Sequence, residues 1–515
     1  MRYILRFLIF LHRWVGIALC VVFLLWFPSG IGMMYWGFPG ISAEDRIDHS
    51  PRLDPAKIML SPEEAAEKAG LQAIPGQVRL NSFDGRPVYR FGGGGGRAAR
   101  GGPGRIIYAD TGEEQTEVSA EMLDRIASAW TGRPFGEAAK IAVEEPDQWT
   151  VAGQLRNRPV YKYSWPDGQQ VYLNGATGDV VQYTTFAKRI QAHLSAIPHW
   201  LYYTPLRKHQ PQWLQFMIWS SLIGTIGAII GIVVALWMYS PRKKYRLESQ
   251  PTGVPYRGQK RWHWIFGMVF GVATITWTFS GLMTLGPFPV VQRLTRTAPR
   301  NEQQQQEIAG ALRGRVRMTD FASIHPRDLL AKVPQLDVRE LEWTSFAGTP
   351  LFNANLGTGK SQLLSLIAAP VDGFDTNRII EIVKNAVPNP NTLELQVIDQ
   401  YDLYYLDRIR QRPLPVIRVL MNDEENTRYY IDPRSARVVS TYSNRNWVNR
   451  WLDSALHSLS FPFLYNHRPL WDIVVITFMV GGTALCVTSL VLAWRVLGRK
   501  LKRANAVSDV LTAEA

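Results

Sequence analysis

Four long apolar runs constrain what this chain of 515 residues can fold into. They lie at about 14–36, 213–238, 264–286 and 470–494. Each is long enough to cross the hydrocarbon core of a bilayer, which needs about 20 apolar residues in a helix. Backbone polar groups must be satisfied within the segment in lipid, so runs of this kind cross as helices. The sequence therefore predicts an α-helical membrane protein with four transmembrane helices.

Basic residues beside these runs predict the orientation, because Lys and Arg are enriched in loops that stay in the cytoplasm. Three groups flank the runs: Arg2, Arg6, Arg13; then Arg242, Lys243, Lys244, Arg246, Arg257, Lys260, Arg261; then Arg495, Arg499, Lys500, Lys502, Arg503. With four crossings all three groups lie on one side. We expect a multi-pass protein of the bacterial inner (plasma) membrane with both termini in the cytoplasm. The first run is longer than a signal-peptide core and lacks a small-x-small site after it, so we expect it to be retained.

The net charge of +14 has two possible explanations. A strongly basic chain can bind nucleic acid. Here the basic residues cluster beside membrane runs, which accounts for much of the charge. We therefore expect membrane lipid as a partner and no nucleic acid.

The runs divide the chain into parts with different expected locations. Two long polar segments, 39–190 and 288–455, are expected in the periplasm. The remaining parts are the first transmembrane helix in 1–38, an outer helix with the second transmembrane helix in 191–239, a basic cytoplasmic loop in 240–262, the third transmembrane helix in 263–287, the fourth in 456–495 and a basic cytoplasmic tail in 496–515. Cys20 and Cys486 both fall in transmembrane runs, so no disulfide is expected in the periplasmic segments.

Each periplasmic segment shows helix starts followed by strand patterns, which predicts two helix-plus-hairpin units per segment. The expected helices are 61–69, 119–131, 326–331 and 376–386, and the expected strands are 87–91, 105–109, 160–163, 170–173, 350–353, 415–419 and 428–432. The third unit has the least clearly marked second strand. The glycine-rich stretch 92–104 lies between two expected strands and is not followed by a GK[ST] sequence, so a flexible hairpin loop is favoured over a phosphate-binding loop.

A short pattern occurs twice, 251 residues apart. His12 and Gly16 recur as His263 and Gly267, and the pairs Ser29-Gly30 and Ser280-Gly281 keep the same shift. The approach to the other two runs is repeated more loosely. Val180-Val181 precedes His193 and Trp213, and Val438-Val439 precedes His457 and Trp471, with 12 residues from 181 to 193 but 18 from 439 to 457. Repetition of this kind predicts a duplicated two-span unit.

The repeated histidines are candidate haem ligands. His12 and His263 would lie at the cytoplasmic ends of the first and third helices, and His193 and His457 on the periplasmic side. Neutral imidazole is a common ligand of haem iron. Two histidines at each depth therefore suit two haem b groups, one in each leaflet.

Small residues accompany these histidines. Gly16 and Gly267 follow their histidines by four residues on the same helix face and leave room for a flat porphyrin. The pairs Ser29-Gly30 and Ser280-Gly281 come about 26 Å further along each helix than the histidines, so Gly30 and Gly281 can make room for the outer haem.

Other interpretations of these residues stay open at this stage. Histidine and aromatic rings are common at membrane interfaces, and small residues also let helices pack closely without a cofactor. His199, His209 and His467 lie near the same periplasmic interface. They could be ligands or could bind haem propionates, but an interfacial role is favoured for each.

At these residues the chain resembles the PepSY-associated transmembrane family. The resemblance rests on Leu11-His12-Arg13-Trp14-Val15-Gly16, on the Ser-Gly pairs, on His457 before Trp471, and on the helix-plus-hairpin units with Asp110-Thr111-Gly112. The family includes bacterial inner-membrane di-haem reductases that release iron from ferric siderophores. The resemblance implies four transmembrane helices around two haems, with two α+β PepSY-like periplasmic domains. The glycine-rich insert and longer outer segments depart from the family pattern and leave the substrate open.

Two functions are therefore considered. The first is a haem b electron-transfer protein that reduces a periplasmic ferric chelate for iron acquisition. It needs an external electron donor, a quinol or a separate cytoplasmic reductase, because the chain has no Rossmann glycine pattern, flavin motif or iron–sulfur cysteine set. The alternative is a non-enzymatic PepSY membrane protein that binds or regulates a periplasmic partner such as a protease.

Overall fold

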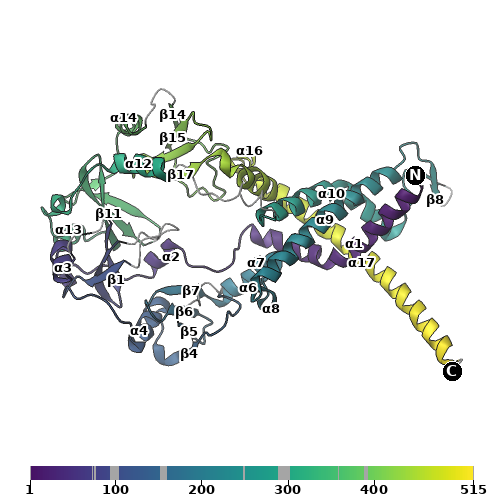
Figure 1. The fold of residues 1–515 in the computed structure, drawn as a ribbon, viewed down its shortest axis with the longest axis horizontal. Helices are drawn as coiled ribbons and strands as arrows, with labels where there is room; N and C mark the ends of the chain where they lie inside the picture. The colour runs from purple at the N-terminus through teal and green to yellow at the C-terminus, as the bar shows by residue number, and fades with distance from the viewer. Residues whose placement is uncertain are drawn as a thin grey trace.

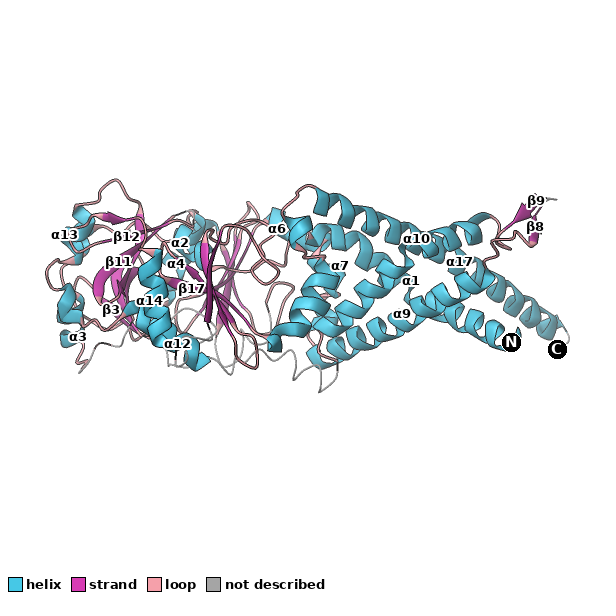
Figure 2. Ribbon diagram, turned by 90° about the horizontal axis from the view of Figure 1, so that it is seen from above, coloured by secondary structure: helices cyan, strands magenta, loops and turns pink. Residues whose placement is uncertain are grey.

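The computed structural model consists of a bundle of long helices joined to a larger α+β head (Figure 1). We call the end of the bundle that joins the head its domain end. The opposite end, where both chain termini and a small hairpin lie, is the terminus end (Figure 2). The structure describes residues 2–71, 74, 77–92, 104–150, 159–247, 250–287, 302–357, 359–387 and 393–513.

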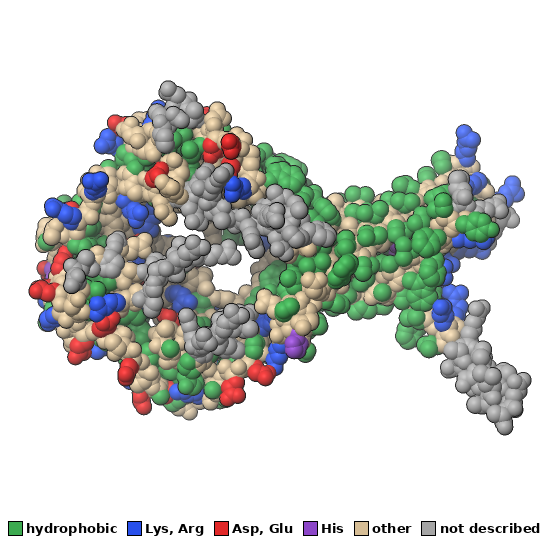
Figure 3. Space-filling view, in the orientation of Figure 1, with side chains coloured by type: hydrophobic (Ala, Val, Ile, Leu, Met, Phe, Trp, Pro, Cys, Tyr) green, Lys and Arg blue, Asp and Glu red, His purple; other side chains and the backbone are tan. Residues whose placement is uncertain are grey.

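Among the described residues, four helices are long and apolar enough to cross a membrane, as the sequence predicts. They are α1 (Arg2–Met33), α9 (Gln210–Met238), α10 (Gly258–Thr284) and α17 (Leu470–Ala513). Apolar side chains such as Phe7, Val269 and Ile473 remain exposed on their outer surfaces. These side chains cover the bundle, and Lys and Arg gather at its terminus end (Figure 3). This surface is suited to lipid rather than water.

The four helices pack as a square. Helix α1 packs against α9 and α17, and α10 packs against the same two helices. Helices α1 and α10 therefore face each other across the middle of the bundle. The histidines that these two helices carry can meet only across that middle.

Two four-stranded antiparallel sheets form the part of the head nearest the bundle. The first sheet has the order β4-β5-β6-β7, and the second has the order β14-β15-β16-β17. Their strands are β4 (Ala139–Ala142), β5 (Val160–Ser164), β6 (Gln170–Asn174), β7 (Val180–Thr184), β14 (Leu393–Ile398), β15 (Val416–Met421), β16 (Arg428–Asp432) and β17 (Arg437–Tyr442). Helix α4 (Ala120–Thr131) packs on the first sheet, and α14 (Thr376–Ala386) and α12 (Glu302–Arg313) pack on the second.

A seven-stranded antiparallel sheet forms the far side of the head, with the order β13-β12-β11-β10-β1-β2-β3. Its strands are β1 (Val78–Phe83), β2 (Arg86–Phe91), β3 (Arg105–Tyr108), β10 (Val338–Phe346), β11 (Thr349–Leu356), β12 (Ser361–Leu364) and β13 (Pro370–Val371). Strands β1 and β10 come from different polar segments of the chain. The two segments thus share one sheet, which the sequence analysis did not anticipate.

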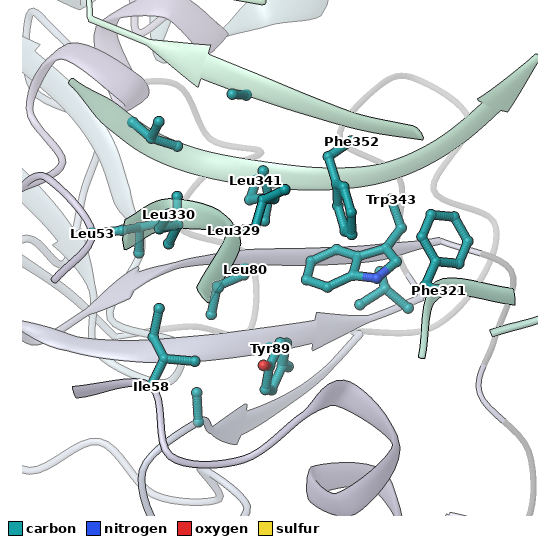
Figure 4. Close-up of a cluster of buried hydrophobic side chains, with 14 of the residues drawn as sticks. Leu53, Ile58, Leu80, Tyr89, Phe321, Leu329, Leu330, Leu341, Trp343 and Phe352 are labelled. Atoms are coloured by element: carbon teal, nitrogen blue, oxygen red, sulfur yellow. The ribbon is translucent and has the colours of Figure 1, made fainter. Parts of the chain in front are cut away.

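The seam between β1 and β10 is held by a continuous apolar core. Leu80 pairs with Leu341 across the seam, and both side chains are fully buried. Tyr89 and Phe352, from the next strand on each side, belong to the same cluster (Figure 4). Burial of this core on both sides of the seam fixes the register, because a shift by one residue would turn these side chains to the opposite face.

The remaining elements are short connections. They are α2 (Ala43–Asp48), η1 (Pro55–Lys57), α3 (Pro62–Lys68), η2 (Phe135–Glu137), α6 (Phe186–Leu194), α7 (Ala196–Trp200), α8 (Thr204–Arg207), β8 (Tyr245–Leu247), β9 (Gln250–Thr252), η3 (Met318–Phe321), α13 (Pro326–Ala331), η5 (Asn444–Asn446), η6 (Val448–Ala455), α15 (Leu456–Ser458) and α16 (Pro462–Tyr465). The predicted helix at 61–69 is present as α3, with the capping box that Ser61 and Glu64 form. Most of the glycine-rich stretch, 93–103, lies outside the described residues.

Asp147 anchors the first four-stranded sheet to the segment that precedes it. Its carboxylate accepts hydrogen bonds from the Tyr172 hydroxyl at 2.6 Å and from the Trp149 backbone N–H at 2.9 Å, and it pairs with Lys162 at 3.3 Å. Burial alone would raise the pKa of Asp147, but these partners hold the pKa below its ordinary value. In the second sheet the Tyr430 hydroxyl donates to Asp402 at 3.0 Å in the same way.

We expect Asp147→Asn to lower the stability of the protein by about 1–3 kcal/mol at pH 7, because charged hydrogen bonds are lost. A carboxyl group whose pKa is lower in the folded than in the unfolded state stabilises the fold above the unfolded value, and this contribution is lost as the pH falls through the folded pKa. The stability difference between wild type and variant should therefore shrink as the pH falls below about 4. Thermal unfolding in detergent between pH 7 and pH 3 measures it. Asp372→Asn, at an exposed carboxylate, is the control, and a difference independent of pH would contradict the assignment.

Candidate functional site

The first histidine pair lies at the terminus end of the bundle. The rings of His12 on α1 and His263 on α10 face each other with their centres 6.1 Å apart. The Nδ1–H of His12 donates to the Gly227 carbonyl of α9 at 2.9 Å. The Nδ1 of His263 lies 3.2 Å from the Thr488 hydroxyl of α17. Both rings are thus held at Nδ1 by a neighbouring helix, which leaves Nε2 available for a ligand.

A cavity of about 1190 Å³ surrounds this terminus-side pair. This volume is slightly above the range of about 300–1,000 Å³ that is usual for ligand-binding sites in proteins. Gly16 and Gly267 line it as expected from their positions, and so do Gly231 of α9 and Gly271, which lies one turn after Gly267 on α10. A Cβ atom at Gly231 would lie 2.6 Å from Cε1 of His12, so a larger residue there would displace the ring. Small residues therefore make space for the histidines and for the cavity between them.

The second pair lies at the domain end. His199 on α7 and His457 on α15 face each other with ring centres 6.0 Å apart. The Ser29 hydroxyl of α1 lies 3.2 Å from Nδ1 of His199. The Ser280 hydroxyl of α10 lies 3.0 Å from Nδ1 of His457. The repeated serine thus holds the Nδ1 atom of each ring in this domain-side pair.

The repeated glycine that follows each serine lies beside the same rings. A Cβ atom at Gly30 would lie 3.7 Å from Cε1 of His199 and 2.9 Å from the Met479 sulfur. A Cβ atom at Gly281 would lie 3.6 Å from Cε1 of His457. A Cβ atom at either glycine would only touch the imidazole at ordinary contact distance, and the tight contact at Gly30 is with Met479.

Both domain-side histidines are partly buried, and the loss of hydration keeps them neutral. Burial, with a smaller contribution from the nearby His457, lowers the pKa of His199 to about 4. Burial also lowers the pKa of His457, although Asp453 acts in the opposite direction. Neutral imidazole carries the lone pair that a metal ion needs. At neutral pH both rings are therefore competent ligands.

The sequence analysis expected His193 at this position, and the structure corrects that expectation. His193 is exposed on α6, where its Nδ1–H donates to the Arg189 carbonyl at 2.8 Å and its ring lies against Trp149. The chain breaks direction at Ser195, whose φ of −126° and ψ of −95° end α6. The following helix α7 then carries His199 to His457.

A signal for His199 was present in the sequence. The interval from 181 to 199 is 18 residues, the same as the interval from 439 to 457. His199 also precedes Trp213 by the 14 residues that separate His457 from Trp471. Both indole N–H groups donate to a backbone carbonyl that directly follows the histidine, that of Trp200 and that of Ser458. The matched spacing is therefore a better guide to the paired histidine than the order in which the histidines occur along the chain.

The other interfacial histidines lie outside the two pairs. His209 and His467 are exposed near the domain ends of α9 and α17. The Nδ1–H of His467 donates to the Phe463 carbonyl at 2.8 Å. His49 stacks on Trp130 in the head. Among the contacts of the described residues, none joins these three rings to a histidine of either pair.

A cross-linking experiment tests the domain-side pairing without any cofactor. In a Cys20→Ala, Cys486→Ala background, cysteines that replace His199 and His457 should be joined by a short bis-maleimide, because the two rings face each other. Cysteines that replace His193 and His457 form the matched control and should not be joined. Mass spectrometry of the cross-linked peptides measures both. Equal cross-linking of the two double variants would contradict the arrangement.

Comparison with known proteins adds a family assignment. A search of the curated proteins finds no significant match to this chain. The family described as PepSY-associated TM region matches residues 9–341, which contain both copies of the His12 pattern and three of the four membrane helices. Since this match covers more than half of the chain, the protein belongs to the PepSY-associated TM region family.

Proposed function

We propose that the chain is a haem b electron-transfer protein of the bacterial inner membrane that reduces a periplasmic acceptor. The acceptor that we favour is a ferric siderophore, and the role is iron acquisition. The observation that carries the proposal is the pair of opposed imidazoles at each end of one membrane bundle. The basic terminus end would face the cytoplasm and the head the periplasm.

The spacing of the rings suits two axial ligands of one metal. Imidazole nitrogens bind metals at about 2 Å, and about 1 Å separates the nitrogen from the ring centre, so two opposed ligands have centres about 6 Å apart. The observed separations are 6.1 Å and 6.0 Å. Two imidazoles alone do not complete the coordination of a metal ion, so a further ligand would be needed. A haem, whose iron histidine commonly binds, is a group that each pair would be able to hold.

Orphaned polar atoms near the domain-side pair also support a bound group. The indole N–H groups of Trp26 and Trp277 are buried and have no acceptor among the described residues. The Trp26 carbonyl lies 3.2 Å from Nδ1 of His199, and the backbone of Trp277 is hydrogen-bonded to His457. A buried donor without an acceptor costs about 1–3 kcal/mol, so such atoms at matched positions are typical of a site completed by a ligand.

The two halves of the bundle use matched contacts, which supports the proposed duplication of a two-span unit. Ser29 and Ser280 hold the two domain-side rings, and Leu201 and Leu459 follow those rings with left-handed φ values of 50° and 47°. Matched backbone conformations at non-glycine positions are uncommon and are difficult to explain without a shared origin. The helix-plus-sheet units of the head would then be the PepSY-like domains of the two halves.

In this function the protein positions two ligand pairs and keeps water from the path between them. His12 with His263, and His199 with His457, would hold the two haems through Nε2. Haem iron supplies one-electron chemistry by alternating between its ferric and ferrous states. Phe23 lines the terminus-side cavity and contacts Phe27, and Phe27 contacts Trp277 beside the domain-side pair. These rings fill the bundle between the two sites with apolar side chains.

The proposed reaction moves one electron outward for each ferric ion reduced. The electron comes from an external donor, either a quinol in the membrane or a separate cytoplasmic reductase. A quinol would release two electrons and two protons and would serve two ferric ions in turn. Reduction loosens a ferric chelate, because hard oxygen donors bind the less charged ferrous ion more weakly.

The haem content of purified variants tests the proposal. Wild-type protein made with ample haem should bind two haem b groups, counted by a pyridine haemochrome assay. His12→Ala, His263→Ala, His199→Ala and His457→Ala should each lose about one haem, because each removes one of two axial ligands. His193→Ala is the matched control and should keep both. A folded wild-type protein without a Soret band would refute the function.

A further inference from the structure

The cavity around the terminus-side pair has a strongly basic mouth. Five cationic side chains are among the residues that line it: Arg13, Arg257, Lys260, Arg495 and Arg499. No aspartate or glutamate is among the described residues that line it. The cavity therefore opens through a ring of positive charge that its own walls do not neutralise.

These cations come from three parts of the chain and converge on one opening. Arg13 lies on α1 and Lys260 on α10, while Arg495 and Arg499 lie on the same face of α17. Among the described residues, Arg13, Lys260 and Arg495 form no ion pair with a carboxylate. The Nε–H of Arg499 donates to the Arg495 carbonyl at 3.0 Å. The ammonium group of Lys260 and the guanidinium groups of Arg13, Arg495 and Arg499 can thus meet an anion at the mouth.

The deeper part of the cavity, unlike its mouth, is lined by uncharged residues. Cys20, Phe23, Gly271 and Cys486 line it on the side toward the middle of the bundle. Cys20 is about 12 Å further along α1 than His12, at a rise of about 1.5 Å per residue. A carboxylate placed there would lose its hydration without gaining a charged partner, which costs several kcal/mol. An anionic group in this cavity can therefore point only toward the mouth.

We propose that the basic mouth binds the two carboxylates of the haem that His12 and His263 hold, so that its carboxylate edge faces the terminus end. This inference rests on the proposed function. It assigns Arg13 and Arg499, from the neighbouring helices α1 and α17, as positioning residues for the group. It also predicts that they stabilise the reduced haem, which carries one more negative charge than the oxidised haem.

The positive-inside bias offers a different explanation of the same cations, because it places Lys and Arg at this end of the helices whatever they contact. The two explanations differ in which residues should matter. Arg6 on α1 and Arg261 on α10 have the same charge and lie at the same end, but they do not line the cavity. They are matched controls for Arg13 and Arg499.

Redox titration of the bound haem tests the proposal. The titration is made in the His199→Ala background, where the terminus-side haem is measured alone. Arg13→Gln with Arg499→Gln should lower the equilibrium constant for reduction of this haem about tenfold. This corresponds to a midpoint potential that is lower by about 59 mV for one electron. Arg13→Lys with Arg499→Lys should restore most of the potential. Arg6→Gln with Arg261→Gln should leave it unchanged.

Each outcome has a definite meaning. An unchanged potential in the Arg13, Arg499 variant with haem bound would overturn the proposal. An equal shift in the Arg6, Arg261 variant would also overturn it and favour a general surface potential. Loss of the haem from the Arg13, Arg499 variant alone, with the protein still monodisperse, would support a carboxylate-binding role. Absence of haem from wild type would refute the proposed function instead, so the two failures are distinguishable.

Discussion

The hydrogen bond at Nδ1 of each paired histidine is the interaction on which the site depends. In His12 the acceptor is a carbonyl that α9 exposes at Gly227, and in His199 and His457 the partners are serines that precede helix glycines. An imidazole buried among apolar helices loses its hydration, and one satisfied nitrogen offsets much of that cost. The same bond sets the ring orientation and leaves the other nitrogen available for a ligand. The hydrogen bond at Nδ1 therefore determines both the position of each ring and the nitrogen that it can offer to a ligand.

The shared sheet in the head has a mechanical consequence for these pairs. Each pair takes one histidine from each half of the chain, so its spacing depends on how the halves are held together. The bundle joins them in the membrane, and the β1–β10 seam joins them again at the far side of the head. Leu80 and Leu341 are buried in that seam, so sliding of one half against the other would expose apolar surface. The two domain-side rings lie between these two fixed connections.

The sequence was sufficient for features that depend on one helix and insufficient for those that depend on contacts between segments. The four membrane helices and the relation of His12 to His263 follow from apolar length and a constant shift of 251 residues. An interfacial role was favoured for His199 because the break at Ser195, which changes the direction of the chain within a few residues, leaves no periodic pattern in the sequence. The seam was missed because β1 and β10 are more than 250 residues apart, and strand pairing at that distance leaves no local pattern.

The two sites differ in their electrostatic surroundings, and in the proposed function this difference would bear on the direction of electron flow. The terminus-side cavity opens through cations, while Asp453 is the carboxylate that acts on His457 at the domain side. Cations favour the reduced form of the first site and a carboxylate disfavours that of the second, so local charge alone would hold an electron at the terminus side. A membrane potential that is negative in the cytoplasm acts in the opposite sense, with about 2.3 kcal/mol per 100 mV for a full crossing. In the proposed function the basic mouth therefore favours capture of the electron, and the membrane potential supplies free energy for its outward transfer.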